Sequence, residues 1–458
     1  MKLNTIISCA ALAACALVNP IHVFAAVSAE EAQQLKSTLT PLGGERAGNK
    51  DGTIPPWSGG ELKAPAGYKP DQRRPDPFAS EKPLYSITAQ NIEQYADKLT
   101  DGQKAMLKRY PSYRMDVYPT HRTAVAPQFV YDNTFKNATN AKLVDGTDYQ
   151  IPSGAFGGTP FPIPKSGLEV MWNHLLRYQG TATRTINGQT WMVTADGKKV
   201  MAVQGRQDIK MPYYDPKGSA ENFDGTYWLT RVVSDGPPIR AGEAIVGQVH
   251  VDDTKTRTWV YLTGQRRVRK LPNPNGDTPT PQSAGLMSFD EVSVFGGGPG
   301  LFDWKLVGKK EILIPYNSYK MLQPDTAEAL MAGSHLNPDA VRWELHRVWV
   351  VDAQLKSGKR HTSPKSRYYI DEDSWLAVLA DRWDTNGQLW KTLFGLSVTY
   401  PEMELTEHVT YGFYDLVTGA WYAGPYVNKS APAIGLQPVA EMKSETFTPD
   451  AMIGDQLR

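Results

Sequence analysis

The sequence predicts a mainly β (α+β) protein: a large antiparallel β half-barrel with amphipathic helices packed in or across its concave face. Apolar residues recur with helical spacing up to residue 178 and with a spacing of two from residue 180 onward. Turn residues interrupt the later part at short intervals, which is typical of a meander of antiparallel strands. Consecutive hairpins with one polar face curl into a barrel or half-barrel, and amphipathic helices then cover the apolar face.

The N-terminus has the pattern of a secretory signal. Lys2 precedes an apolar run over residues 6–18, which is shorter than the roughly 20 apolar residues of a transmembrane helix. Val23 and Ala25 fit the positions before a cleavage site, so we expect cleavage near Ala25 and a periplasmic protein. A lipobox ending at Cys15 is the alternative and would give a lipid-anchored N-terminus. The apolar residues that follow Cys15 favour Ala25.

Composition excludes several classes of protein. Both cysteines, Cys9 and Cys15, lie in the predicted signal, so the mature chain has no disulfide, thiolate nucleophile or cysteine metal site. The 49 Lys and Arg residues balance 48 Asp and Glu residues, which argues against a nucleic-acid partner. We expect four regions: the signal 1–25, helices and an extended arm over 26–165, a helix plus half-barrel over 166–430, and a C-terminal extension over 431–458.

The predicted helices precede the strands. Ser28 and Glu31 have the spacing of a capping box for a helix over 28–40. Residues 41–86 then form an extended wrapping arm, for which a flexible linker is the alternative. Amphipathic helices are predicted to open at Thr88 and Thr100, and the clearest helix covers 166–178, where apolar residues recur at helical spacing.

The predicted strands form a series of hairpins. Asn187-Gly188 has the sequence of a type I′ turn between strands over 181–185 and 189–194. The longest predicted strand covers 341–356, with a dry face and a wet face that carries Glu344 and His346. An acidic turn follows at 371–373, and we expect it to be solvated. His250 and His346 fit wet strand positions.

Several segments match a known family. Residues 39–49, 113–122, 161–164 and 304–311 resemble the domain of unknown function 1329 (DUF1329) family over nearly the whole mature chain. Residues 259–269 and 369–375 also look like strands of outer-membrane lipoprotein-sorting carriers of the LolA/LolB type. The second resemblance implies an open half-barrel that carries lipid or acylated cargo and works with an RND-type exporter and an outer-membrane partner.

The sequence carries no catalytic motif. The histidines show no HExxH or other paired metal spacing, so we predict no metal and no cofactor; a zinc site assembled from distant positions stays an alternative. Asp371 and Asp381 are the carboxylates that an exported hydrolase acting on polysaccharide or ester would use. The turn 371–373 and the pair Asp381 and Asp384 could also supply carboxylates for calcium.

The leading hypothesis is therefore a periplasmic carrier that holds a lipid or other apolar cargo without covalent chemistry. Its alternatives are the exported hydrolase and a structural subunit of an envelope complex. Head-group candidates at the rim are Arg266, Arg267 and Arg269. Aromatic residues are the candidates for lining the cavity, and they are Trp172, Trp191, Trp228, Trp259, Tyr261, Trp343, Trp349 and Trp375.

Overall fold

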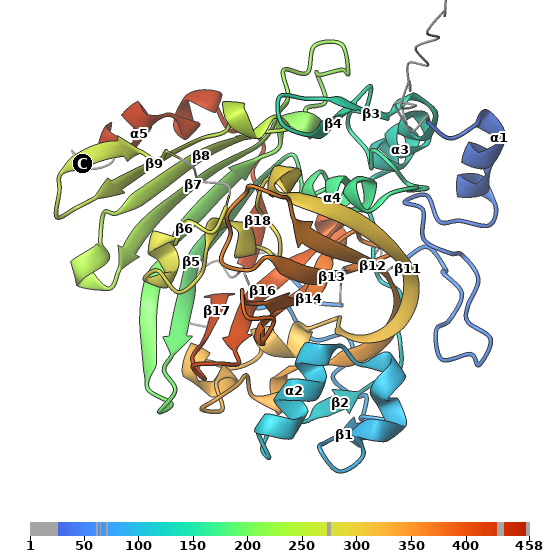
Figure 1. The fold of residues 1–458 in the computed structure, drawn as a ribbon, viewed down its shortest axis with the longest axis vertical. Helices are drawn as coiled ribbons and strands as arrows, with labels where there is room; N and C mark the ends of the chain where they lie inside the picture. The colour runs from blue at the N-terminus through green and yellow to red at the C-terminus, as the bar shows by residue number, and fades with distance from the viewer. Residues whose placement is uncertain are drawn as a thin grey trace, which may run out of the picture.

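The computed structural model describes residues 26–60, 63–64, 66–69, 72–272, 276–427 and 435–454. The predicted signal, with Cys15 and Ala25, lies outside the described residues. As predicted, the protein is mostly β, with one 16-stranded mixed sheet and few helices (Figure 1). No helix within the described ranges combines the length and the apolar character needed to cross a membrane.

The helices are short, and the clearest of them begin at local capping signals. Capping boxes start α1, α2 and α4, as the sequence predicts for residues 28, 100 and 166. The segment after Thr88 forms a 3-10 turn, Ile92–Lys98, instead of the predicted α-helix. Helix α3 was not predicted. The bounds are α1 (Ala29–Ala32), α2 (Asp101–Arg109), α3 (Gln128–Asn140), α4 (Gly167–Leu175) and α5 (Pro449–Gly454).

Most strands of the sheet lie after residue 182. The first four are short: β1 (Tyr85–Ile87), β2 (Met115–Val117), and the separate pair β3 (Lys142–Asp145) and β4 (Gln150–Ser153). The others are β5 (Ala182–Val193), β6 (Lys199–Lys210), β7 (Thr226–Gly236), β8 (Ala244–His250), β9 (Arg257–Leu262), β10 (Arg267–Lys270), β11 (Phe302–Pro315), β12 (Trp343–Leu355), β13 (Lys365–Asp371), β14 (Ala377–Trp383), β15 (Leu389–Tyr400), β16 (Leu405–Asp415), β17 (Trp421–Tyr426) and β18 (Gly435–Pro438).

The sheet consists of two meanders joined in the middle. Strands β11 to β17 pair in chain order, and so do β5 to β10. The last strand of the later meander, β17, pairs antiparallel with β5, which makes one continuous sheet. The parallel contact is a single bridge between β2 and β12. The described strand order ends at β1 and β10, so the sheet is not a closed barrel.

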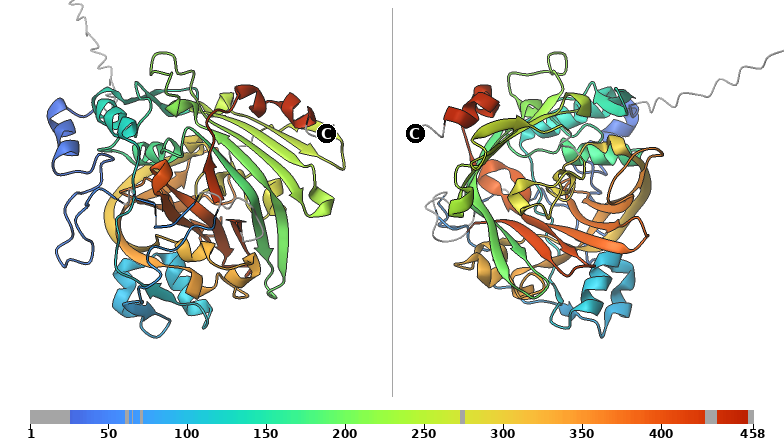
Figure 2. Two further views of the ribbon diagram at one scale, coloured as in Figure 1. Left: turned by 180° about the vertical axis from the view of Figure 1, so that it is seen from behind. Right: turned by 60° about the vertical axis from the view of Figure 1, so that its left-hand side comes forward.

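Different parts of the chain cover the two faces of the sheet. On strands β7 to β9, Leu229 and Val246 pack against Phe447 and Met452 of the C-terminal segment, and we call this side the outer face. Figure 2 shows that segment lying across these strands. On the other meander, N-terminal residues such as Ile54 join one apolar cluster, whereas α4 packs on β11 and β12 in a second cluster.

The predicted hairpin at Asn187-Gly188 is wrong. Strand β5 runs through these residues without turning, and the register of its pairing with β6 shifts between Thr185 and Gly188. Asn187 has a positive φ of 55°. A left-handed residue suits a β-bulge as well as a type I′ turn, so the dipeptide alone did not distinguish them.

The prediction that one face of β12 is solvated is also wrong for the first residues of the strand. Glu344 and His346 are 0 % and 1 % exposed, and the acidic turn Asp371 to Asp373 is buried as well. The segment that follows β2 covers them: the His121 amide donates to Glu344 over 2.8 Å, and Thr120 donates to the Leu345 carbonyl over 2.9 Å. His250 is likewise buried.

We predict that Phe447→Ala destabilises the protein by about 3–5 kcal/mol, because the ring is fully buried and its loss leaves a cavity between the C-terminal segment and the sheet. The free energy of unfolding, measured with urea, checks this. Ile239→Ala is the control, since Ile239 is 84 % exposed and its truncation is expected to change stability by less than about 0.5 kcal/mol. Equal effects at the two positions would contradict the assigned packing.

Candidate functional site

A pocket lies on the inner face of the wall formed by β5 to β9. Its floor consists of side chains that alternate along the strands, including Trp228, Thr230 and Val232 of β7 and Ile245 and Val249 of β8. The intervening residues of the same strands point to the outer face and pack against the C-terminal segment. The two faces follow from the period of two in an extended strand. The pocket has a volume of about 130 Å³.

The floor of the pocket is hollow because the side chains in its central cross-strand row are small. Cross-strand pairing aligns Thr230 of β7 with Gly247 of β8, and Gly247 with Thr258 of β9. A Cβ atom added at Gly247 would lie 3.0 Å from the Thr230 methyl group. The rows on each side are larger, with Val232 opposite Ile245. The sheet therefore has a groove at this row instead of interdigitated side chains.

A roof covers the groove. We call residues 276–300 the roof segment; it contributes Thr280, Met287, Phe289 and Val292 to the pocket. Tyr411 of β16 and Tyr422 of β17 close one side. Figure 2 shows the roof segment inside the curve of the sheet. Most of the lining is thus apolar, and the polar side chain of Gln207 of β6 borders it opposite Val232.

Buried ion pairs hold the roof segment on the later strands. Asp290 lies 2.9 Å from Arg382 of β14, and Glu291 lies 2.9 Å from Lys391 of β15. His361 also contacts Asp290, over 3.1 Å. Burial by itself raises the pKa of Asp290, but the charges of Arg382 and His361 hold it well below its ordinary value. Breaking a buried pair of this kind costs about 3–5 kcal/mol, so the roof position is well fixed on this side.

His174 of α4 ties the helix to the roof and to β14. Its Nε2 donates to the Phe295 carbonyl over 2.8 Å, and its Nδ1 accepts from the Ala377 amide over 3.0 Å. Burial lowers the pKa of His174 to about 3, which keeps the ring neutral and suited to donate at one nitrogen and accept at the other.

Of the aromatic residues predicted to line a cavity, Trp228 lines this pocket. Trp259 and Tyr261 lie on the outer face and pack against the C-terminal segment. Trp191 and Trp343 belong to the cluster that contains Ile54. Contact with cargo stays a prediction for all of them.

The remaining predicted aromatics surround α4. Trp172 is buried on α4 itself, and its indole nitrogen donates to the Gln150 carbonyl. Trp349 and Trp375 stack with their ring centroids 6.3 Å apart. The indole nitrogen of Trp375 donates to the Leu42 carbonyl over 2.8 Å. These rings fill the space between α4 and the sheet.

The predicted rim cations lie at the free edge of the wall. Arg266 occupies the turn after β9, and Arg267 and Arg269 are exposed on β10. None of them lines the pocket. The sequence did not single out the small row at Gly247. Thr230 and Val232 lie on either side of Arg231 and so share one face of the strand, but this spacing does not show which face borders a cavity.

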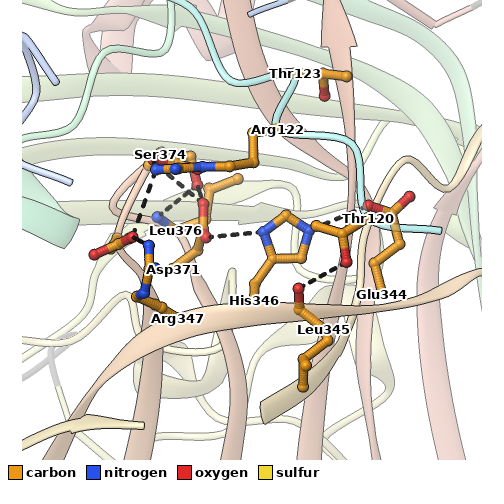
Figure 3. Close-up of polar contacts among 12 residues, drawn as sticks. Thr120, Arg122, Thr123, Glu344, Leu345, His346, Arg347, Asp371, Ser374 and Leu376 are labelled. Atoms are coloured by element: carbon orange, nitrogen blue, oxygen red, sulfur yellow. Dashed lines mark hydrogen bonds and ion pairs between the residues drawn. The ribbon is translucent and has the colours of Figure 1, made fainter. Parts of the chain in front are cut away.

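A second group of polar side chains is buried beneath the segment 118–123 (Figure 3). We call it the carboxylate cluster: Glu344, Asp371, Glu372 and Asp373 with His346 and their cationic partners. Arg122 binds both oxygens of Asp373, over 2.6 and 2.7 Å. Lys309 lies 2.7 Å from Glu372. Burial and the charge of Asp373 raise the pKa of Asp371 to about 7.

The carboxylates proposed for a hydrolase are not exposed to a substrate. Asp371 and Asp381 are both 0 % exposed, and neither lines the pocket. Asp381 accepts a hydrogen bond from Thr392 over 3.0 Å and lies against Gly102 at the start of α2. Both carboxyl groups therefore contact other residues of the protein interior and are not positioned to contact a substrate in the pocket.

The family model described as "Protein of unknown function (DUF1329)" matches residues 86–453. The chain belongs to the DUF1329 family. Uncharacterized protein PA3922 of Pseudomonas aeruginosa is 40 % identical over 444 residues, which cover 95 % of this chain and 96 % of that protein. The DUF1329 assignment made from the sequence is thus confirmed.

The solved structures that this chain resembles include the following three. A lipoprotein-sorting protein domain from Vibrio parahaemolyticus has a TM-score of 0.43 at 14 % identity and covers 63 % of this chain and 98 % of its own. A DUF1329 family protein from Desulfovibrio piger gives 0.43 at 14 %, covering 62 % and 97 %. The LolA superfamily protein NE2245 from Nitrosomonas europaea gives 0.36 at 11 %, covering 63 % and 100 %.

We predict that Asp381→Asn stabilises the protein more at pH 8 than at pH 4. Burial raises the pKa of Asp381 to about 6, above the 3.8 of an unfolded chain, so the folded state prefers the protonated form. The free energy of unfolding therefore falls as pH rises from about 4 to about 6 and then stays level, an effect that asparagine lacks.

Urea unfolding of both proteins at the two pH values checks this. The difference between the variant and the wild type is expected to change by on the order of 2 kcal/mol. A difference that is independent of pH would show that Asp381 is ionised without penalty in the fold.

Proposed function

We propose that this protein is a periplasmic carrier that binds a lipid or another apolar molecule in the pocket between the β5–β9 wall and the roof segment. In this proposal the curved wall acts as a half-barrel and the roof segment as its cover. The observation that carries it is the apolar groove left by the small row Thr230, Gly247 and Thr258. Such a site needs no catalytic residue and no cofactor.

The size of the pocket fits part of an acyl chain. A volume of about 130 Å³ holds roughly ten water molecules, since each needs about 10–15 Å³ in this measure. Replacing that water by an apolar chain is favourable by about 0.8 kcal/mol for each buried methylene. About six methylenes would contribute about 5 kcal/mol before the costs of association. A longer cargo requires the roof segment to move outward.

Gln207 is the residue that we assign to the polar head group of the cargo. It pairs with Val232 across the sheet, so its side chain lies on the inner face, and it lines the pocket. Its amide nitrogen donates to the Thr230 hydroxyl over 3.3 Å. An RND-type exporter and an outer-membrane partner complete the proposal, and they rest on the sequence resemblance to lipoprotein-sorting carriers.

We predict that Val232→Trp lowers the affinity for a fluorescent fatty acid at least about tenfold, because the indole fills a groove that the valine leaves open. Fluorescence titration of delipidated protein measures this, and mass spectrometry of gently purified protein measures the lipid that copurifies. Val417→Trp is the matched control, since Val417 is 49 % exposed and lies outside the pocket. Wild-type protein that binds no lipid, or equal binding by both variants, would contradict the carrier function.

A further inference from the structure

The carboxylate cluster lies outside the pocket, and the carrier function does not use it. Nearly every carboxylate in it has a cationic partner. Arg342 contacts Glu344 over 2.5 Å, Lys309 and Arg347 contact Glu372 over 2.7 and 3.3 Å, and Arg122 contacts Asp373 over 2.6 Å. Asp371 is the exception: no Arg or Lys within the described ranges forms an ion pair with it, although it is fully buried.

One oxygen of Asp371 is satisfied and the other is not. Oδ2 accepts from the amide and the hydroxyl of Ser374, over 2.9 and 2.6 Å. Oδ1 is buried without a hydrogen-bond partner among the described residues. It points at His346 Nδ1 over 3.8 Å, a separation too long for a hydrogen bond (Figure 3). An unsatisfied buried carboxylate oxygen of this kind is costly, and either a cation or a proton can offset the cost.

The hydrogen bond of His346 Nε2 orients the ring so that Nδ1 can act as a metal ligand. Nε2 lies 3.1 Å from Glu344 Oε2 and donates its proton to that carboxylate, which leaves a lone pair on Nδ1 facing Asp371. A histidine that binds a metal almost always donates its second N–H to a carboxylate or a carbonyl in this way. Glu344 itself is fixed by Arg342, by Asn317 over 3.0 Å and by the His121 amide.

Tyr316 adds an independent sign of a missing partner. Its ring packs on His346 with the centroids 4.1 Å apart, and it is 0 % exposed. Its hydroxyl has no hydrogen-bond partner among the described residues. Burial, followed by the charges of Asp371, Asp373 and Glu344, raises the pKa of Tyr316, so its hydroxyl is exposed to the field of the same carboxylates.

We propose that His346, Asp371 and Asp373 bind a structural divalent cation of the zinc type. One ligand atom from each of the three lies within 4.8 Å of the others. Tetrahedral zinc with bonds of about 2.0–2.2 Å places its ligand atoms roughly 3.4 Å apart, close to the 3.8 Å between Nδ1 and Oδ1. One imidazole and two carboxylates suit zinc among the common divalent ions.

The ion pair of Asp373 with Arg122 is compatible with this role. A carboxylate has about four lone-pair positions, so the two that face the guanidinium leave others for a cation.

The bound ion would fasten the N-terminal region to the sheet. Arg122 also donates to the Glu45 carbonyl over 2.7 Å, and Arg347 donates to the Ala47 carbonyl over 3.0 Å. The cluster thus joins residues 45–47, the segment 118–123, β12 and the turn after β13. A cation at its centre would stabilise all four against separation.

The test uses purified protein that is unfolded with EDTA, refolded without metal and then titrated with Zn²⁺ alone. We expect the thermal midpoint to rise with Zn²⁺, and protein isolated without chelator to contain zinc near one ion per chain by elemental mass spectrometry. Asp371→Asn is expected to lower Zn²⁺ affinity at least about tenfold. Asp381→Asn removes an equally buried carboxyl outside the cluster and should retain the full response.

Cobalt provides a readout that does not depend on the variants. Co²⁺ added to metal-free wild-type protein is expected to give the visible absorption bands of a four-coordinate site, and Zn²⁺ should displace them. His346→Gln should abolish these bands. The proposal is overturned if Co²⁺ gives no such bands, if Zn²⁺ leaves the wild-type midpoint unchanged, or if Asp371→Asn responds to Zn²⁺ as the wild type does. A proton held between Asp371 and His346 would then be the partner.

Discussion

Both faces of the β5–β9 wall carry apolar side chains, so each face must be covered by another part of the chain. On the outer face the cover is close-packed, with Phe447 and Met452 buried against Leu229 and Val246. On the inner face the roof segment spans the strands without filling the row at Gly247. The outer face is therefore filled by side chains, whereas the inner face keeps a pocket that can hold a ligand.

Buried charge holds two of the covers in place. Asp290 and Arg382 fix the roof segment, and Asp373 and Arg122 fix the N-terminal region. Removing such groups from water is costly, and the cost is offset where each charge has a close partner. Within the carboxylate cluster, Asp371 has no Arg or Lys partner among the described residues, which is why the cluster carries the inference of a bound cation. The two groups lie on separate parts of the structure and serve different covers.

Sequence reasoning succeeded where a signal is local. The helices predicted to open at Thr100 and Ser166 do begin there, because a helix start depends on a few neighbouring residues. It failed where a segment distant in the sequence decides whether a side chain is buried. Glu344 and His346 alternate with apolar residues as on a solvated face, yet residues 120–122 bury them. The residues near position 344 in the sequence give no signal that residues 120–122 cover it.

The sequence by itself determined the family, the mostly β composition and the alternation of side chains along each strand, because these follow from local pattern. Which of the two alternating sets faces the cavity was decided by the tertiary structure. Trp259 and Tyr261 share one face of β9, as their spacing requires, but the C-terminal segment occupies that face and the roof segment occupies the other. A period of two assigns residues to opposite faces without saying which face is inner, and only long-range packing supplies that choice.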